Sequence, residues 1–108
     1  MVFALRVLEV VEALPATPKG RNMADQLCRS GTSVAANYRA ACRAKSRADF
    51  ISKLGTVEEE ADETIFWLEL ICRSKILPAQ RLDSLIQEAN EILSMVVASI
   101  RTAKRNRS

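Results

Sequence analysis

The feature that most constrains this chain is a run of apolar residues between positions 50 and 71 whose spacing alternates between four and three. This spacing places every member on one face of a helix, whereas a half-buried strand would alternate at every second residue. The members are Phe50, Leu54, Val57, Ala61, Thr64, Leu68 and Ile71. A helix of this length must bury its apolar face against other helices, so the pattern indicates a helical bundle.

Three further segments carry the same pattern, and together the four segments predict four helices. Their apolar faces are Phe3, Val7, Val10 and Leu14, then Leu27, Gly31, Val34, Tyr38 and Ala41, and last Leu82, Leu85, Ala89, Ile92, Val96 and Ile100. The expected helices cover approximately residues 2–14, 22–44, 47–74 and 78–104. No segment alternates like a strand, and three glycines and three prolines are few for the turns of an all-β domain.

Capping residues and prolines set the expected helix ends. Pro15 and Pro18 stop the first helix, and Asn22 is an N-cap candidate for the second. Ser46, with Asp49 three residues later, forms a capping-box pattern for the third helix. Proline is favoured at the first helical position, so the fourth helix is expected to begin at Pro78.

Short connections between these helices predict an all-α, antiparallel up-down-up-down four-helix bundle. A chain of 108 residues, 48% of them hydrophobic, supports one domain with one core. We expect residues 1–104 to form the bundle and residues 105–108 to form a basic C-terminal tail, because the apolar pattern is lost there.

Charges are segregated along the chain, whose formal net charge is +3. Residues 58–72 contain six acids and no base, whereas residues 1–57 contain nine bases and four acids. In an up-down bundle, the ends of the second and fourth helices meet the start of the third at one pole. The basic residues expected near that pole are Arg39, Arg43, Lys45, Arg47, Lys53, Arg101, Lys104, Arg105 and Arg107. They are candidates for binding the phosphates of RNA or DNA, and the alternative is a solvated surface with favourable cations at helix C-termini.

The connection near Lys45 is short enough to make the second and third helices an antiparallel hairpin. Positions equidistant from it lie opposite each other, which sets Arg29 at the level of Asp62, with Glu59 or Glu63 beside it. We expect a structural ion pair of Arg29 with Asp62 and Glu63 that fixes the register of the hairpin. If that pair is buried, removing one partner would cost about 3–5 kcal/mol.

Residue types argue against a catalytic or metal site. Histidine is absent, which removes the commonest general base and metal ligand. Glu59, Asp62 and Glu63 share a helical face that suits a carboxylate metal site, but the facing helices supply few inward acids. We therefore expect no enzyme activity, no metal and no cofactor. Three cysteines without a Cys-x-x-Cys pair favour a reducing cytoplasm, and no apolar run reaches the ~20 residues that span a membrane.

A second apolar group on the third helix lies outside its main face. Phe66, Trp67 and Leu70 make the helix apolar almost all round, and one bundle core does not readily use all of these side chains. We expect them at an oligomer interface, where aromatic residues are enriched. The alternative is a wide core stripe.

Two stretches of the sequence carry a family resemblance. RSGTSVAANYRAA (29–41) and SRADFISKLGTVEEEADETIFWLEL (46–70) resemble the bacterial four-helix bundle protein family, which includes proteins encoded by intervening sequences in 23S ribosomal RNA genes. More distantly, the chain is similar to the accessory protein of diversity-generating retroelements. The resemblance covers about residues 3–100. The matching positions are Arg29, Ser30, Ser33, Asn37, Tyr38, Arg39, Ser46, Asp49, Phe50, Glu60, Asp62, Glu63 and Trp67.

What this resemblance implies is a homopentameric bundle protein without enzymatic activity, for which nucleic-acid binding through a basic surface is suspected. Its retroelement relatives partner a reverse transcriptase. The chain departs from the family at Ala40, Glu58 and Glu59, and the two glutamates strengthen its acidic stretch. We thus expect a cytoplasmic homo-oligomer that binds RNA or DNA at its basic pole and does not act at a membrane. The alternative is an oligomeric adaptor for a protein partner such as a reverse transcriptase.

Overall fold

The structure, a computed structural model, describes residues 1–106 and consists almost entirely of helix. Its elements are α1 (Val2–Ala13), α2 (Pro18–Cys42), α3 (Arg47–Arg73), a short 3-10 helix η1 (Ala79–Arg81) and α4 (Asp83–Arg105). The described part of the chain contains no strand. The all-α prediction with four helices is therefore confirmed.

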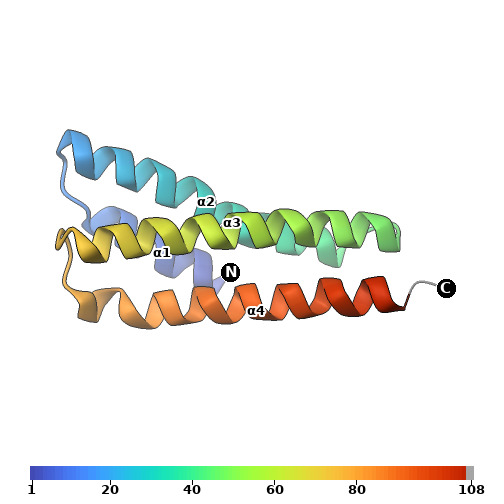
Figure 1. The fold of residues 1–108 in the computed structure, drawn as a ribbon. Helices are drawn as coiled ribbons and strands as arrows, with labels where there is room; N and C mark the ends of the chain where they lie inside the picture. Colours follow the sequence, from blue (N-terminus) through green and yellow to red (C-terminus); the bar gives the residue numbers. More distant parts are fainter. Residues whose placement is uncertain (107–108) are drawn as a thin grey trace.

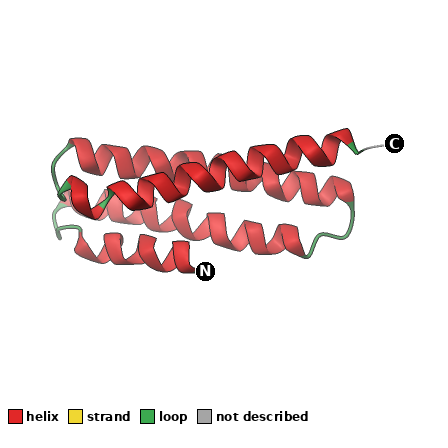
Figure 2. Cartoon of the chain, turned by 90° about the horizontal axis from the view of Figure 1, so that it is seen from below, coloured by secondary structure: helices red, strands yellow, loops and turns green. Residues whose placement is uncertain are grey.

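Consecutive helices run in opposite directions along a rod of 52 × 20 × 20 Å. Figure 1 shows that α2 leads away from the α1–α2 loop, α3 returns beside it, and α4 leads away again. Figure 2, seen from below, places the connections at the two ends of the rod. The end that holds the α2–α3 connection also holds the C-terminus of α4, as expected for an up-down bundle.

The apolar faces read from the sequence form the core of the bundle. Val57, Leu68 and Ile71 of α3 are 0% exposed, and Leu27 of α2 is equally buried. The largest exception is Tyr38, which shares the predicted face of α2 but is 44% exposed. Tyr38 lies beside Met1 and Phe3, at the level where α1 begins.

α2 begins four residues earlier than the expected start at residue 22. Thr17 is the N-cap, and its Oγ1 accepts a hydrogen bond from the Gly20 N–H at 3.0 Å. Pro18 takes the first helical position. A backbone N–H at this position has no partner within the helix, so the missing N–H of proline costs no hydrogen bond. The prediction of an N-cap at Asn22 was wrong because Pro18 starts the second helix instead of only stopping the first.

α4 also begins differently from the prediction. Pro78 is the extended N-cap of η1, and α4 starts at Asp83 after the fully buried Leu82. The missing N–H of a proline suits either kind of helix, so Pro78 marks a helical start without specifying a regular α-helix.

α1 is much shorter than its neighbours. It has 12 residues against 23 in α4 and 25 in α2, which corresponds to about 18 Å of helix beside about 35 Å of α4. Figure 1 shows the N-terminus halfway along the rod. One half of the molecule therefore has four helices, and the other half has only α2, α3 and α4.

Candidate nucleic-acid interface

The predicted basic residues gather at the three-helix end of the rod. The last turn of α2, the connection after it and the start of α3 carry four exposed bases, Arg39, Arg43, Lys45 and Arg47. The last turns of α4 reach the same end and carry further exposed bases. We define the basic pole as Arg39, Arg43, Lys45, Arg47, Arg101, Lys104 and Arg105. The predicted Arg107 lies outside the described residues.

The basic pole has little internal neutralisation. None of its seven side chains forms an ion pair within residues 1–106. Lys53, which was predicted to belong to this group, is different, because its Nζ lies 2.8 Å from Asp49 Oδ1 and its side chain is only 37% exposed. The pole therefore presents uncompensated positive charge, and Lys53 is largely committed to Asp49.

Asp49 organises the connection that presents the pole. Its N–H donates to Ser46 Oγ at 3.0 Å, and its own Oδ2 accepts from the Lys45 N–H at 3.2 Å. The hydrogen bond from Lys53, followed by that from the Lys45 backbone, holds the pKa of Asp49 below its ordinary value. The predicted capping pattern thus forms with one change: the Asp49 carboxylate accepts a hydrogen bond from the Lys45 N–H and not from the Ser46 N–H.

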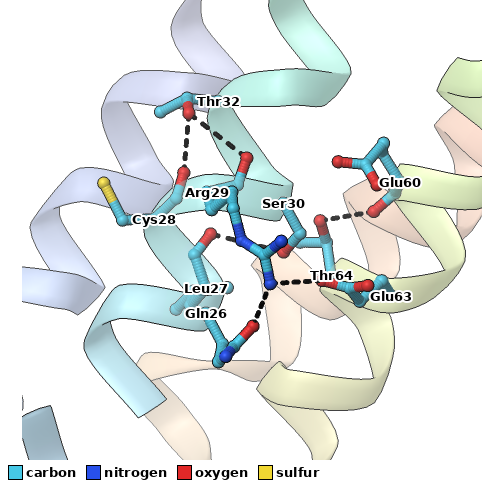
Figure 3. Close-up of polar contacts among 9 residues, drawn as sticks. All are labelled: Gln26, Leu27, Cys28, Arg29, Ser30, Thr32, Glu60, Glu63 and Thr64. Carbon is cyan, nitrogen blue, oxygen red and sulfur yellow. Dashed lines mark hydrogen bonds and ion pairs between the residues drawn. The ribbon is translucent and has the colours of Figure 1, made fainter. Parts of the chain in front are cut away.

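The predicted ion pair of the α2–α3 hairpin is made by Glu63 and not by Asp62. Arg29 Nη2 lies 4.0 Å from Glu63 Oε2, and it also bonds Gln26 one turn back (Figure 3). Asp62 is exposed and pairs with no base among the described residues. The Arg29 side chain is 69% exposed, so the pair is a surface contact that cannot fix the hairpin register strongly.

Hydroxyl groups near Arg29 are satisfied within their own helices. The buried Ser30 donates to Leu27 O at 3.4 Å, and the buried Thr64 donates to Glu60 O at 2.7 Å (Figure 3). Thr32 likewise donates to a carbonyl one turn back. These bonds are the usual ones for hydroxyls inside helices, and they tie the three side chains to their own helices.

The candidate oligomer residues divide by exposure. Phe66 is 54% exposed and lies edge-to-face on Trp67, with ring centroids 5.0 Å apart. Trp67 and Leu70 are half-buried and pack against the core. Only Phe66 therefore projects as a free apolar side chain on this part of α3.

Two hollows lie where the bundle lacks its fourth helix. One, of about 190 Å³, is lined by Met1, Phe3, Val34, Ala35, Tyr38, Ile92 and Met95. The other, of about 450 Å³, lies nearer the basic pole and is lined by Phe50, Ala98, Ser99, Thr102, Ala103 and Asn106. Sequence reasoning missed these residues as a site, although the short length expected for the first helix was a signal that α2 and α4 would be left partly uncovered.

Other kinds of site find little support in the described residues. Among them, no group of three or more His, Cys, Asp or Glu side chains is placed to hold a metal ion. Cys28, Cys42 and Cys72 are all free thiols. No helix in residues 1–106 has the length and apolar character needed to cross a membrane.

Comparison with known proteins places this architecture in a defined context. The model of a family described as 23S rRNA-intervening sequence protein matches residues 1–98. A crystal structure of a protein of unknown function from the S23 ribosomal protein family of Bacteroides thetaiotaomicron is similar, with a TM-score of 0.84 and 39% sequence identity. That similarity covers 91% of each chain. No functionally curated protein matches.

Proposed function

The chain belongs to the 23S rRNA-intervening sequence protein family, and from this premise we propose that it is a non-enzymatic protein that binds RNA or DNA through its basic pole. It acts in the cytoplasm, an assignment supported by its three free cysteines. No step of catalysis is needed for such a role, and the absence of histidine accords with it.

The observation that carries this proposal is the uncompensated charge of the basic pole. Seven exposed bases from α2, α3 and α4 lie at one end of the rod without an ion pair within residues 1–106. The acidic residues 58–72 lie further along α3, towards the other end. This separation creates a positive end that attracts polyanions, and phosphate neutralisation there releases counterions.

A salt titration tests the proposal. We expect the logarithm of the binding constant for a fluorescein-labelled RNA oligonucleotide to fall linearly with the logarithm of salt concentration. Replacing Arg39, Arg43 and Arg47 by glutamine should lower the steepness of that slope by about 2, since each lost phosphate contact removes about 0.7–0.9.

A matched control removes the same charge from the opposite end of the rod. Arg73, Lys75 and Arg81 are exposed near the α3–α4 connection, so their triple glutamine variant has the same net charge as the pole variant. We expect it to bind as the unaltered protein does. Equal weakening by both variants, or binding without a salt slope, contradicts the proposal.

A second candidate function is assembly with further copies or with another protein, and the exposure of Phe66 favours it. An aromatic side chain that is 54% exposed and packed edge-to-face against Trp67 is the kind of anchor found at interface centres. Glu59, Asp62 and Glu69 are exposed on the same helix and would form a polar rim. The pentamer implied by family resemblance belongs to this candidate.

Native mass spectrometry with light scattering tests this second candidate. We expect an oligomer at tens of micromolar, and Phe66→Ser should shift the distribution towards the monomer without lowering helical content. The control is Met95→Ser, which changes an exposed side chain on α4 at 49% exposure. A clean monomer of the unaltered protein would remove the homo-oligomer from consideration.

A further inference from the structure

The faces of α2 and α4 that hold α1 continue beyond the point where α1 begins. On α4, Arg6 of α1 bonds Glu88 and Ser84, and the same face continues towards the basic pole. Its later members are Ile92, Met95, Ser99, Thr102 and Asn106, at alternating spacings of three and four. The first two of these line the smaller hollow beside α1, and the last three line the larger one.

The corresponding face of α2 continues in the same way. Gly31 lies against Val7 of α1, and seven residues later Tyr38 occupies the same side of the helix without α1 to cover it. Phe50 of α3 is half-buried and borders the larger hollow. The molecule thus has an open corner, bounded by α2, α3 and α4, where the fourth helix of the bundle is missing.

Arginines stand along both edges of this open corner. Arg39 and Arg43 line a broad hollow of about 860 Å³ between α1 and α2, which meets the corner at Tyr38. On the α4 side, Arg105 follows Thr102 by three residues, so their side chains are neighbours on the helix surface. These cations favour an anionic occupant beside the corner.

We infer that the open corner binds the unpaired nucleotides of a single-stranded nucleic acid, an inference that rests on the proposed function. Proteins that bind single strands combine aromatic side chains, on which bases stack, with a positive groove that follows the phosphates. Tyr38 and Phe50 supply aromatic rings, and the arginines supply the charge. Ser99, Thr102 and Asn106 add donors and acceptors for base edges or ribose hydroxyls.

The α4 side of the corner favours nucleotides over an acidic helix from a protein partner. A docked amphipathic helix needs an apolar stripe continued over several turns. Here α4 presents no large apolar side chain to the larger hollow after Met95, because the hollow is lined by Ser99, Thr102 and Asn106 together with the small Ala98 and Ala103. Hydroxyl and amide groups next to the half-buried ring of Phe50 suit bases better than they suit leucine-like anchors.

A comparison of the affinities for single-stranded and duplex RNA tests the inference. A labelled 20-nucleotide RNA without secondary structure and the duplex of the same sequence are titrated separately with the full chain at one salt concentration. Tyr38→Leu should weaken single-strand binding about fivefold or more, which is the low end for loss of one stacked base. Duplex binding, which uses the arginines alone, should change by less than twofold.

Two further measurements make the outcome decisive. Tyr38→Phe keeps the aromatic ring and should leave both affinities within twofold of those of the unaltered protein. Ultraviolet crosslinking of the unaltered protein to the single strand, followed by peptide mass spectrometry, should find adducts on peptides containing Tyr38 or Phe50. Thermal unfolding followed by circular dichroism verifies that the variants fold.

The results separate the failure of this inference from the failure of the proposed function. If neither the two RNAs nor the single-stranded and duplex DNAs of the same sequence bind, both are overturned. If both RNAs bind with a salt slope but Tyr38→Leu weakens neither or weakens both equally, the basic pole still binds nucleic acid and the open corner is not its single-strand site. If an acidic helical peptide binds at the open corner and single-stranded RNA does not displace it, the inference is also overturned.

Discussion

Gly31 of α2 and Val7 of α1 lie so close that a Cβ added to Gly31 would be 2.5 Å from Val7 Cγ1. Val7 is fully buried, so its side chain cannot move out into solvent to relieve the contact. The absence of a side chain at Gly31 therefore sets how closely α1 approaches α2. Since α1 has only 12 residues, this contact is central to holding it on the bundle.

We predict that Gly31→Ala destabilises the protein. Alanine gains about 1 kcal/mol of helix propensity over glycine, but overpacking a closed core costs about 1–3 kcal/mol. The expected net loss is about 1 kcal/mol, measured by urea unfolding. In the Val7→Ala background the substitution should cost much less, because the clashing methyl groups are gone. Equal costs in both backgrounds would contradict this explanation.

Gly55 of α3 provides the opposite prediction. It lies inside a long helix, and nothing approaches an added Cβ within 4 Å. Gly55→Ala should therefore stabilise the protein by up to about 1 kcal/mol through helix propensity alone. Urea unfolding that shows a loss of stability instead would mean that Gly55 has a packing partner, such as a second subunit.

The helical fold was predictable from the sequence because its signals are local and repeated. The face from Leu54 to Ile71 keeps one spacing over several turns, and Ser46 caps α3 through the Asp49 N–H. The start of α2 was missed because a proline that ends one helix and a proline that begins the next look alike. Only the fold shows that Thr17 caps the turn that follows it.

The candidate site was predictable only in part, because it depends on relations between helices. The bases of the α2–α3 connection were found from their crowding in the sequence. The partner of Arg29 was assigned partly to Asp62 because neighbouring positions on a helix differ by about 100° in direction, which sequence separation alone does not resolve. The open corner required the positions of three helices relative to the end of α1.

We predict that Arg29→Ala changes stability by less than about 0.5 kcal/mol, because an exposed ion pair contributes little. The Arg29 and Glu63 side chains are 69% and 40% exposed, and their charged atoms are 4.0 Å apart. Urea unfolding at neutral pH measures the effect. A loss of 3 kcal/mol or more would mean that the pair is buried, for example within an oligomer.

The N-cap of α3 gives a larger expected effect than the Arg29 pair. Ser46→Ala removes the acceptor for the Asp49 N–H, and loss of a serine cap costs about 1 kcal/mol. Ser46→Asp should restore most of the stability, because a carboxylate is also a good N-cap. Urea unfolding of the two variants at pH 7 distinguishes loss of the cap from loss of an unrelated serine contact.

Asp49→Asn should produce a loss of stability that depends on pH. The hydrogen bonds from Lys53 and from the Lys45 backbone hold the pKa of Asp49 below its ordinary value in the folded protein. A carboxylate with a lowered folded pKa stabilises the fold at pH values above the unfolded pKa of about 3.9. That stabilisation is lost as the pH falls through the lower, folded pKa. The stability difference between the unaltered protein and Asp49→Asn should therefore stay constant from pH 7 to pH 5 and shrink below pH 4.

Urea unfolding across this pH range measures the difference, and Ser46→Ala, which removes no titrating group, is the control. A stability difference that persists undiminished at the lowest pH would assign the effect of Asp49→Asn to altered capping and not to charge.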